Sequence, residues 1–302
     1  MPIKVEKITE PQVLGEGPHW DEKQQCLYFV DIIGKSINKY VPATGLHTST
    51  KVDGRVGCII PVEGTTDQFL LGVELQFVIV RWDGCSETPA TLVRVVAEVD
   101  AGTKNRINDA KADPKGRVYG GTMGHEEPLG NVAKNEGSFY RLAGDKMTQL
   151  EQGISISNGL AWDVKAKAFY YIDSLERKIR RYNYDVNIGE ISNRSYIFDL
   201  DKNDLPGSAD GMTIDTDGNL WVANFNGSAV IKVDPKSGKI LQKVPIPALQ
   251  VTSVTFGGPN YDVLFVTTAS MEIEGPQLHP SGATFLVTGL GVKGLPNVNY
   301  KP

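Results

Sequence analysis

The sequence predicts an all-β protein, a single six-bladed β-propeller with four-stranded blades that spans residues 1–302. Glycine and proline account for 32 and 17 of the 302 residues, which favours many turns over long helices. A short apolar strand recurs six times at intervals of 41 to 51 residues, a spacing typical of propeller blades. A pair of β-sandwiches is the alternative all-β arrangement, but the regular spacing favours the propeller.

The recurring unit is a turn, an apolar five-residue strand and a second strand of alternating character. The turns resemble 113–116 and 215–218, where Gly supplies a positive φ and Asp bonds its own backbone. The apolar strands are nearly continuous in hydrophobicity because neighbouring blades cover both of their faces. They are 27–31, 68–72, 118–122, 169–173, 220–224 and 264–268.

Three of these strands are followed by a strand of period two, which is typical of a half-buried strand, and we expect these to be outer strands. They cover residues 36–40, 178–182 and 229–233. A propeller closes when both chain ends share a blade. We therefore expect residues 3–8 to add an outer strand to the last unit, beside residues 283–287.

Charge and hydropathy exclude two classes of partner. Lys and Arg number 31 against 36 Asp and Glu, a net charge of −5, and no basic run exceeds the pair Arg180–Arg181. This pattern argues against nucleic acid. The most apolar stretch, 69–82, is interrupted by polar residues and is too short to span a bilayer. We expect a monomer that binds a small molecule.

Cysteine usage indicates a reducing compartment. Cys26, Cys58 and Cys85 are odd in number and widely spaced, with no CxxC pair, which suits reduced thiols in the cytoplasm. The first eleven residues carry charges where a signal peptide needs an apolar core. We therefore expect a cytoplasmic protein.

Several familiar sequence motifs are absent or occur where the neighbouring residues do not support their usual function. Residues 289–294 fit GxGxxG, but only eight residues follow, too few for the helix of a dinucleotide site. Residues 215–218 look like the start of a calcium loop, but a strand follows at once. The chain contains neither GxSxG nor HExxH, so it supports neither a hydrolase elbow nor a histidine-rich zinc site.

Four polar segments remain, each about 10 to 15 residues before the apolar strand of a different unit. Innermost propeller strands line one channel, so we expect these segments to converge on its mouth. Glu16, Asn158 and Asp210 would then offer two carboxylates and an amide oxygen, ligands suited to Ca²⁺, Mg²⁺ or Mn²⁺. The segments are 15–18, 105–109, 157–160 and 209–212.

Each candidate has an ordinary structural explanation. Asn158–Gly159 and Asp210–Gly211 are common turn dipeptides. Arg106 could pair with Asp109 and brace a loop. Glu16 lies between two glycines, and Glu is a poor turn residue, so a ligand role is harder to dismiss there.

These segments resemble the senescence-marker-protein, regucalcin, gluconolactonase and luciferin-regenerating-enzyme family, and the resemblance runs from about residue 15 to 294. Residues 15–21, 250–260 and 289–294 are similar to insect members. The matching phrases are GEGPHW (15–20), NRINDAKAD (105–113), GTM (121–123), ISNGL (156–160), FYYIDS (169–174), DGM (210–212), FGG (256–258) and GLGVKG (289–294).

The resemblance implies a six-bladed propeller that holds one divalent cation, Ca²⁺, Mg²⁺, Mn²⁺ or Zn²⁺, at the channel mouth. It assigns metal ligation to Glu16, Asn158 and Asp210. It assigns substrate contacts to Arg106, Asn108 and Glu126. The stretch after Met123 differs from the family pattern, so Glu127 is an alternative to Glu126. We expect the following loop, 128–137, to form a lid over the mouth.

The function that follows is metal-dependent hydrolysis of a small lactone, as in gluconolactonase. A cation there would act as a Lewis acid. Asp210 would ligate it through one oxygen and act as the catalytic base through the other. Arg106 and Asn108 would orient the substrate. Two alternatives stay open: conversion of oxyluciferin to a cyanobenzothiazole, and non-catalytic calcium binding of the regucalcin kind.

Overall fold

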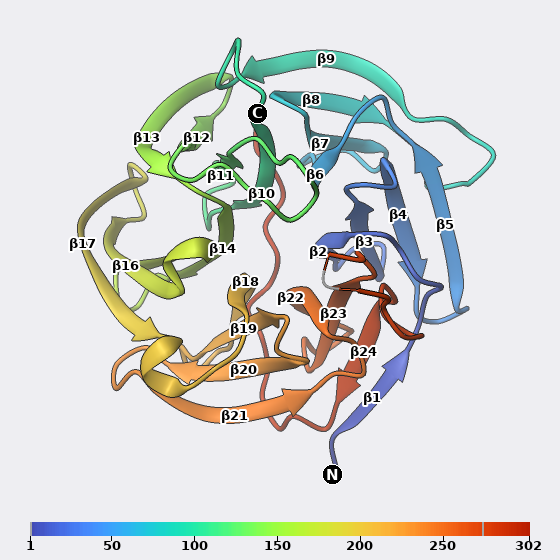
Figure 1. Cartoon of the computed structure of the whole chain (residues 1–302). Coiled ribbons are helices and arrows are strands. Elements are labelled where there is room, and N and C mark those ends of the chain that lie inside the picture. Colours follow the sequence, from blue (N-terminus) through green and yellow to red (C-terminus); the bar gives the residue numbers. More distant parts are fainter. Residues whose placement is uncertain (1, 274) are drawn as a thin grey trace.

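Six four-stranded antiparallel sheets surround a central axis in the computed structural model, which describes residues 2–273 and 275–302 (Figure 1). Five sheets use four strands that are consecutive in the chain, and the sixth combines the two chain ends. The described helical structure consists of two short 3-10 turns, η1 (Ser174–Glu176) and η2 (Asp201–Asn203). The predicted all-β, six-bladed propeller is confirmed.

The blades are numbered in chain order, and their strands are given from the axis outward. Blade 1 contains β2 (Gly15–Asp21), β3 (Cys26–Asp31), β4 (Ser36–Val41) and β5 (Leu46–Lys51). Blade 2 contains β6 (Val56–Pro61), β7 (Gln68–Val73), β8 (Gln76–Arg81) and β9 (Thr91–Glu98). Blade 3 contains β10 (Arg106–Ala112), β11 (Val118–Met123), β12 (Gly137–Ala143) and β13 (Lys146–Ile154).

The second half of the ring repeats this order. Blade 4 contains β14 (Ser157–Asp163), β15 (Ala168–Asp173), β16 (Lys178–Asp185) and β17 (Glu190–Asp199). Blade 5 contains β18 (Ser208–Ile214), β19 (Leu220–Phe225), β20 (Ala229–Asp234) and β21 (Lys239–Pro245). Blade 6 contains β22 (Gln250–Gly257), β23 (Val263–Ala269), β24 (Phe285–Thr288) and β1 (Lys4–Lys7).

The six apolar strands predicted from the repeat are the second strands of the blades, β3, β7, β11, β15, β19 and β23. The expectation that the strands after them are outer strands is wrong. They are the third strands β4, β16 and β20, and a fourth strand lies outside each one. They are also more buried than expected because neighbouring blades cover much of both faces.

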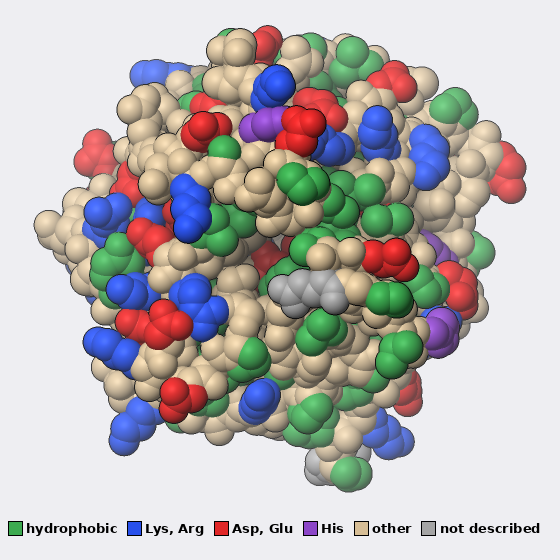
Figure 2. All heavy atoms as spheres, viewed as in Figure 1, with side chains coloured by type: hydrophobic (Ala, Val, Ile, Leu, Met, Phe, Trp, Pro, Cys, Tyr) green, Lys and Arg blue, Asp and Glu red, His purple; other side chains and the backbone are tan. Residues whose placement is uncertain are grey.

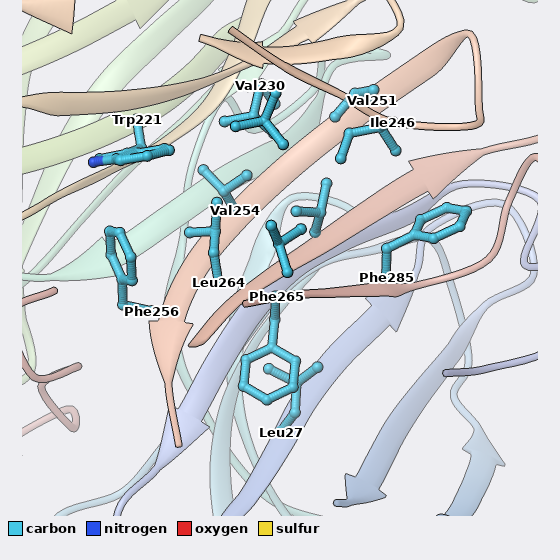
Figure 3. Close-up of a cluster of buried hydrophobic side chains, with 14 of the residues drawn as sticks. Leu27, Trp221, Val230, Ile246, Val251, Val254, Phe256, Leu264, Phe265 and Phe285 are labelled. Atoms are coloured by element: carbon cyan, nitrogen blue, oxygen red, sulfur yellow. The ribbon is translucent and has the colours of Figure 1, made fainter. Parts of the chain in front are cut away.

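Apolar side chains fill the wedges between blades. One cluster joins blades 5, 6 and 1, with Trp221 edge-on to Phe256 and Phe265 beside Leu27 (Figure 3). Trp20 of β2 stacks on Phe265 of β23 with ring centroids 5.3 Å apart. This packing buries the large apolar side chains between sheets and leaves the axis to smaller and polar residues.

The ring is closed by the pairing predicted from the chain ends. β1 pairs with β24 in antiparallel register, from Lys4 opposite Thr288 to Lys7 opposite Phe285. The N-terminal strand therefore completes a sheet whose inner three strands come from the C-terminal end of the chain.

The segment after β24 crosses the end of the channel where the inner strands finish. Figure 1 shows it in red, running across the middle of the ring. Its backbone bonds to three blades, from Leu295 N to Ile214 O (3.4 Å), from Tyr300 N to Pro61 O (2.9 Å) and from Lys301 N to Gly116 O (2.9 Å). This end of the channel is therefore covered, and the opposite end forms the mouth.

No helix within residues 2–273 and 275–302 has the length and apolar character needed to cross a membrane.

Candidate metal and substrate site

All six inner strands break their register with the second strand near their first residues. A bulge of this kind bends the strand and re-aims side chains. Because every inner strand starts at the mouth, the six breaks face the same end of the channel. They lie between Glu16 and His19, Val56 and Cys58, Ile107 and Asp109, Asn158 and Leu160, Ala209 and Met212, and Val251 and Ser253.

The six residues proposed from the sequence line one cavity of about 230 Å³ at the mouth: Glu16, Arg106, Asn108, Glu126, Asn158 and Asp210. They come from blades 1, 3, 4 and 5. Figure 2 looks onto this face and shows a hollow near its centre, with acidic atoms at its depth. The structure therefore brings together side chains that are up to 194 residues apart in the chain.

The glycines of this region belong to the bulges. Asn158–Gly159 and Asp210–Gly211 lie within β14 and β18, so the turn explanation does not apply to them. A Cβ on Gly159 would lie 2.6 Å from the carbonyl oxygen of Asp210. Glycine is therefore needed for the close approach of these two bulged strands.

Asn158 is held in one orientation. Its Nδ2 donates to Ser174 Oγ (2.9 Å), and this hydroxyl donates to the carbonyl oxygen of Ala209 (2.8 Å). The Asn158 Oδ1 atom is buried and has no hydrogen-bond partner among the described residues. An unpartnered buried acceptor is costly, so this oxygen is available to a ligand.

Two buried acids share the cavity with Asn158. Burial and, secondarily, the negative charge of Asp109 raise the pKa of Glu16 to about 8. Burial and the charge of Glu16 raise the pKa of Asp210 well above its usual range. A cation between these carboxylates would offset both the lost hydration and the mutual repulsion.

Arg106 and Asn108 form a pair beside the acids. Arg106 is 4% exposed, and its Nη1 donates to Asn108 Oδ1 at 2.7 Å. Asn108 Nδ2 donates in turn to the carbonyl oxygen of Ser157 at 2.8 Å. Arg106 Nη1 thus bonds to Asn108 and to the carbonyl oxygen of Ile107, and the loop-bracing pair with Asp109 is not formed among the described residues. Arg106 Nε has no partner within the described chain and can donate to a ligand.

The structure separates Glu126 from Glu127. Glu126 lines the cavity, and its Oε1 accepts a bond from Gly130 N (2.7 Å). The Glu127 side chain is 76% exposed and pairs with His125 Nε2 at 2.9 Å. Of the two acids, Glu126 is therefore the one that a bound molecule can reach.

The loop expected to act as a lid lies at the mouth. Gly130 and Val132 both line the cavity. A Cβ on Gly130 would lie 2.5 Å from Ile273 Cγ2, so the loop touches the segment that follows β23. Two loops from blades 3 and 6 therefore meet over one side of the cavity.

Sequence reasoning missed three polar residues of this cavity, Ser174, Ser208 and Asn226. Ser174 orients Asn158, but a serine after a strand carries no distinctive pattern. Asn226 has a φ of 58° and precedes Gly227, which looks like an ordinary turn in the sequence. Its Oδ1 is buried without a partner in the described part of the chain.

The donor set fits a divalent cation that prefers oxygen. Among residues 2–273 and 275–302, no three His, Cys, Asp or Glu side chains are grouped to hold a metal. Glu16, Asp210 and Asn158 instead offer two carboxylates and the free amide oxygen described above. Such a set suits Ca²⁺, Mg²⁺ or Mn²⁺ better than a metal that requires nitrogen or sulfur.

A family model described as "SMP-30/Gluconolactonase/LRE-like region" matches residues 14–270. The chain belongs to this family. The resemblance predicted from the ordered sequence phrases is confirmed. Regucalcin from Danio rerio is 38% identical over 303 residues, covering 99% of this chain and 98% of the relative. Regucalcin from Gallus gallus is 37% identical, with 97% of each chain covered.

Solved structures of SMP-30/gluconolactonase relatives share the fold. A luciferin-regenerating enzyme superposes with a TM-score of 0.93 and 41% identity, with 100% of both chains covered. Regucalcin from Agrobacterium tumefaciens, described as a calcium-binding protein, gives a TM-score of 0.87 at 24% identity, covering 100% of this chain and 99% of that one. A protein named as an enzyme and one described as calcium-binding thus share this propeller fold.

Proposed function

We propose that this chain is a divalent-metal-dependent hydrolase that acts on a small lactone, as gluconolactonases do. The observation that carries the proposal is the convergence of Glu16, Asn158 and Asp210 on one cavity, with Asn158 Oδ1 buried and free. The family description, which includes gluconolactonase, supports the same reaction class.

Glu16, Asn158 and Asp210 would hold the cation. Bound there, a divalent cation supplies Lewis acidity toward a carbonyl oxygen and makes water easier to deprotonate. Three protein ligands leave coordination positions open for exchangeable molecules, which favours catalysis over calcium buffering.

The chain's own residues then handle the substrate and the proton. One carboxylate oxygen of Asp210 accepts a proton from the attacking water, whose oxygen bonds to the lactone carbonyl carbon. The ring C–O bond breaks, and the departing oxygen takes the proton back from Asp210, which gives a hydroxy acid and restores the carboxylate. Arg106, with its free Nε, donates to the oxygen where negative charge develops. Asn108 holds Arg106, and Glu126 provides a polar contact from the lid side.

Two other functions have specific support. The 41% identity to a luciferin-regenerating enzyme over the whole chain favours conversion of oxyluciferin to a cyanobenzothiazole. The relatives named regucalcin favour calcium binding without catalysis. The proposed cation site is compatible with all three functions, so the reaction is what separates them.

Chelation and metal add-back test the proposal. Wild-type protein stripped with chelator should lose lactone hydrolysis and recover it with one of Ca²⁺, Mg²⁺, Mn²⁺ or Zn²⁺. Asp210→Asn should lower kcat/KM by about 100-fold or more and weaken cation binding measured by calorimetry. Asp217→Asn, at an exposed turn position, is the matched control.

The outcomes are distinct. Full hydrolysis by Asp210→Asn would contradict the assignment of the base. Turnover of oxyluciferin without hydrolysis of any lactone would favour the second function. Tight calcium binding with no turnover of either substrate would favour the regulatory protein.

A further inference from the structure

The upper wall of the cavity is built differently from its floor. At the end of the second strand, or within two residues after it, five of the six blades place an apolar side chain on the cavity. Ile273 extends this wall in blade 6. We call these residues the apolar collar: Ile32, Met123, Leu175, Phe225, Met271 and Ile273.

Blade 2 departs from this arrangement. Its second strand is followed by Glu74, whose Oε2 pairs with Arg55 Nη2 at 2.8 Å instead of facing the cavity. The collar therefore depends on which residue each blade carries at this equivalent position. Because five of the six blades carry an apolar residue there, the collar surrounds most of the cavity. Figure 2 shows hydrophobic side chains along much of the edge of the central hollow.

Collar and floor impose opposite requirements on one bound molecule. The floor offers Glu16, Asp210, Asn158 and Arg106 to a compact polar group. Collar side chains can neither donate nor accept a strong hydrogen bond, so a hydroxyl against them would lose water without replacement. Glu126, Ser208 and Asn226 also line the cavity, but collar residues make up most of the wall around them. A polyhydroxylated ring therefore places hydroxyls against apolar side chains, whereas an apolar ring removes both its own surface and the collar from water.

The cavity volume indicates how much of an apolar body the cavity can enclose. An apolar cavity of about 150 Å³ accommodates benzene. The cavity here has about 230 Å³, which accommodates one aromatic ring together with a small fused ring.

We propose that the substrates of this chain are lactones fused to an aromatic or similarly apolar ring, in preference to sugar lactones. The carbonyl lies at the polar floor, and the apolar ring lies within the collar. This inference rests on the proposed lactone hydrolysis and specifies its substrate class.

The test compares two six-membered lactones, 3,4-dihydrocoumarin and glucono-δ-lactone, on the metal-loaded full chain. We expect kcat/KM to be at least about tenfold higher for the benzo-fused lactone. The double variant Leu175→Asn with Ile273→Asn should reduce that ratio about tenfold, mainly through KM. Leu175 is 40% exposed and Ile273 is only partly buried, so the fold should tolerate the change. Leu241→Asn, 53% exposed on β21, is the matched control and should leave the ratio unchanged.

A binding measurement separates failure of this inference from failure of the proposed function. The lactam 3,4-dihydro-2-quinolinone has the same fused rings and resists hydrolysis. Calorimetry should show that it binds the wild type and binds the double variant about tenfold more weakly. Lactam binding without hydrolysis of either lactone would support binding of an apolar ring at the collar and contradict the proposed lactone hydrolysis. A preference for glucono-δ-lactone, or equal lactam affinity in wild type and double variant, would overturn the inference.

Discussion

Asn158 illustrates how a single side chain acquires a chemical role from its neighbours. Its position beside a glycine on an inner strand was readable from the sequence, but its orientation depends on Ser174, which fixes Nδ2 and leaves Oδ1 free. Glu126 and Glu127 make the same point. They are adjacent in the chain, yet one lines the cavity and the other pairs with His125 in solvent.

The buried histidine at the far end of the channel gives a prediction at this scale. His19 Nε2 lies 3.2 Å from Asn299 Oδ1, and burial lowers the pKa of His19 to about 4. The unfolded chain takes up its proton near pH 6.5, so the folded state is penalised as pH falls between about 6.5 and 4. This single group should remove about 3 kcal/mol from the free energy of unfolding across that window.

Urea unfolding at pH 7 and pH 4.5 measures this effect. The loss of stability between the two pH values should be smaller in His19→Gln than in wild type. His279→Gln, at an exposed position, serves as control and should behave as the wild type does. An identical loss in wild type and His19→Gln would refute the assignment to His19.

The inner strand with its bulge is the element that converts a repeated fold into a site. Gly159 allows β14 to approach the backbone of β18, and the same register breaks turn Asn158 and Asp210 toward the cavity. A sequence shows the glycines but does not distinguish a bulge from a turn, because both use the same dipeptides.

Gly159→Ala tests this element. The added Cβ would lie 2.6 Å from Asp210 O and 2.7 Å from Met212 Cβ, so the start of β18 must move. We expect cation affinity, measured by calorimetry, to fall by about tenfold or more because the carboxylate of Asp210 is displaced.

Gly102→Ala separates this effect from the general cost of replacing a glycine. Gly102 has a φ of 81°, and no described atom lies within 4 Å of its added Cβ. This control should destabilise the fold by about 1–2 kcal/mol with unchanged cation affinity. Unchanged affinity in Gly159→Ala would show that the close strand approach does not hold the site.

At the scale of the whole molecule, both chain ends contribute to the ring. β1 completes blade 6, and the C-terminal segment connects blades 2, 3 and 5 across the end of the channel opposite the mouth. Tyr300 is fully buried there, and its hydroxyl donates to Gly144 O at 3.0 Å.

Replacing Tyr300 measures what this crossing segment contributes. Tyr300→Ala should lower the free energy of unfolding by about 3–5 kcal/mol, as for other large buried aromatics. Tyr300→Phe keeps the ring and should lose only about 1 kcal/mol for the hydrogen bond. Urea unfolding of both variants provides the comparison, and equal losses would show that ring packing contributes little.

Local sequence was sufficient to predict the six repeats, the second strand of each blade, the closing strand and the polar segments of the site. Each of these depends on residue type and spacing over a few positions, which a strand or a bulge expresses directly. The third strands were misassigned because their burial depends on neighbouring blades, which periodicity does not encode.

Contacts between distant residues decided the remaining features. Four features arise where separate blades meet: the free oxygen of Asn158, the position of Glu126 rather than Glu127 on the cavity, the apolar collar, and the cover of the channel end by the C-terminal segment. Residues that carry no distinctive pattern in their own segments form the polar floor and the apolar collar there. Their partners lie tens to hundreds of positions away, so only the closed ring brings these groups together.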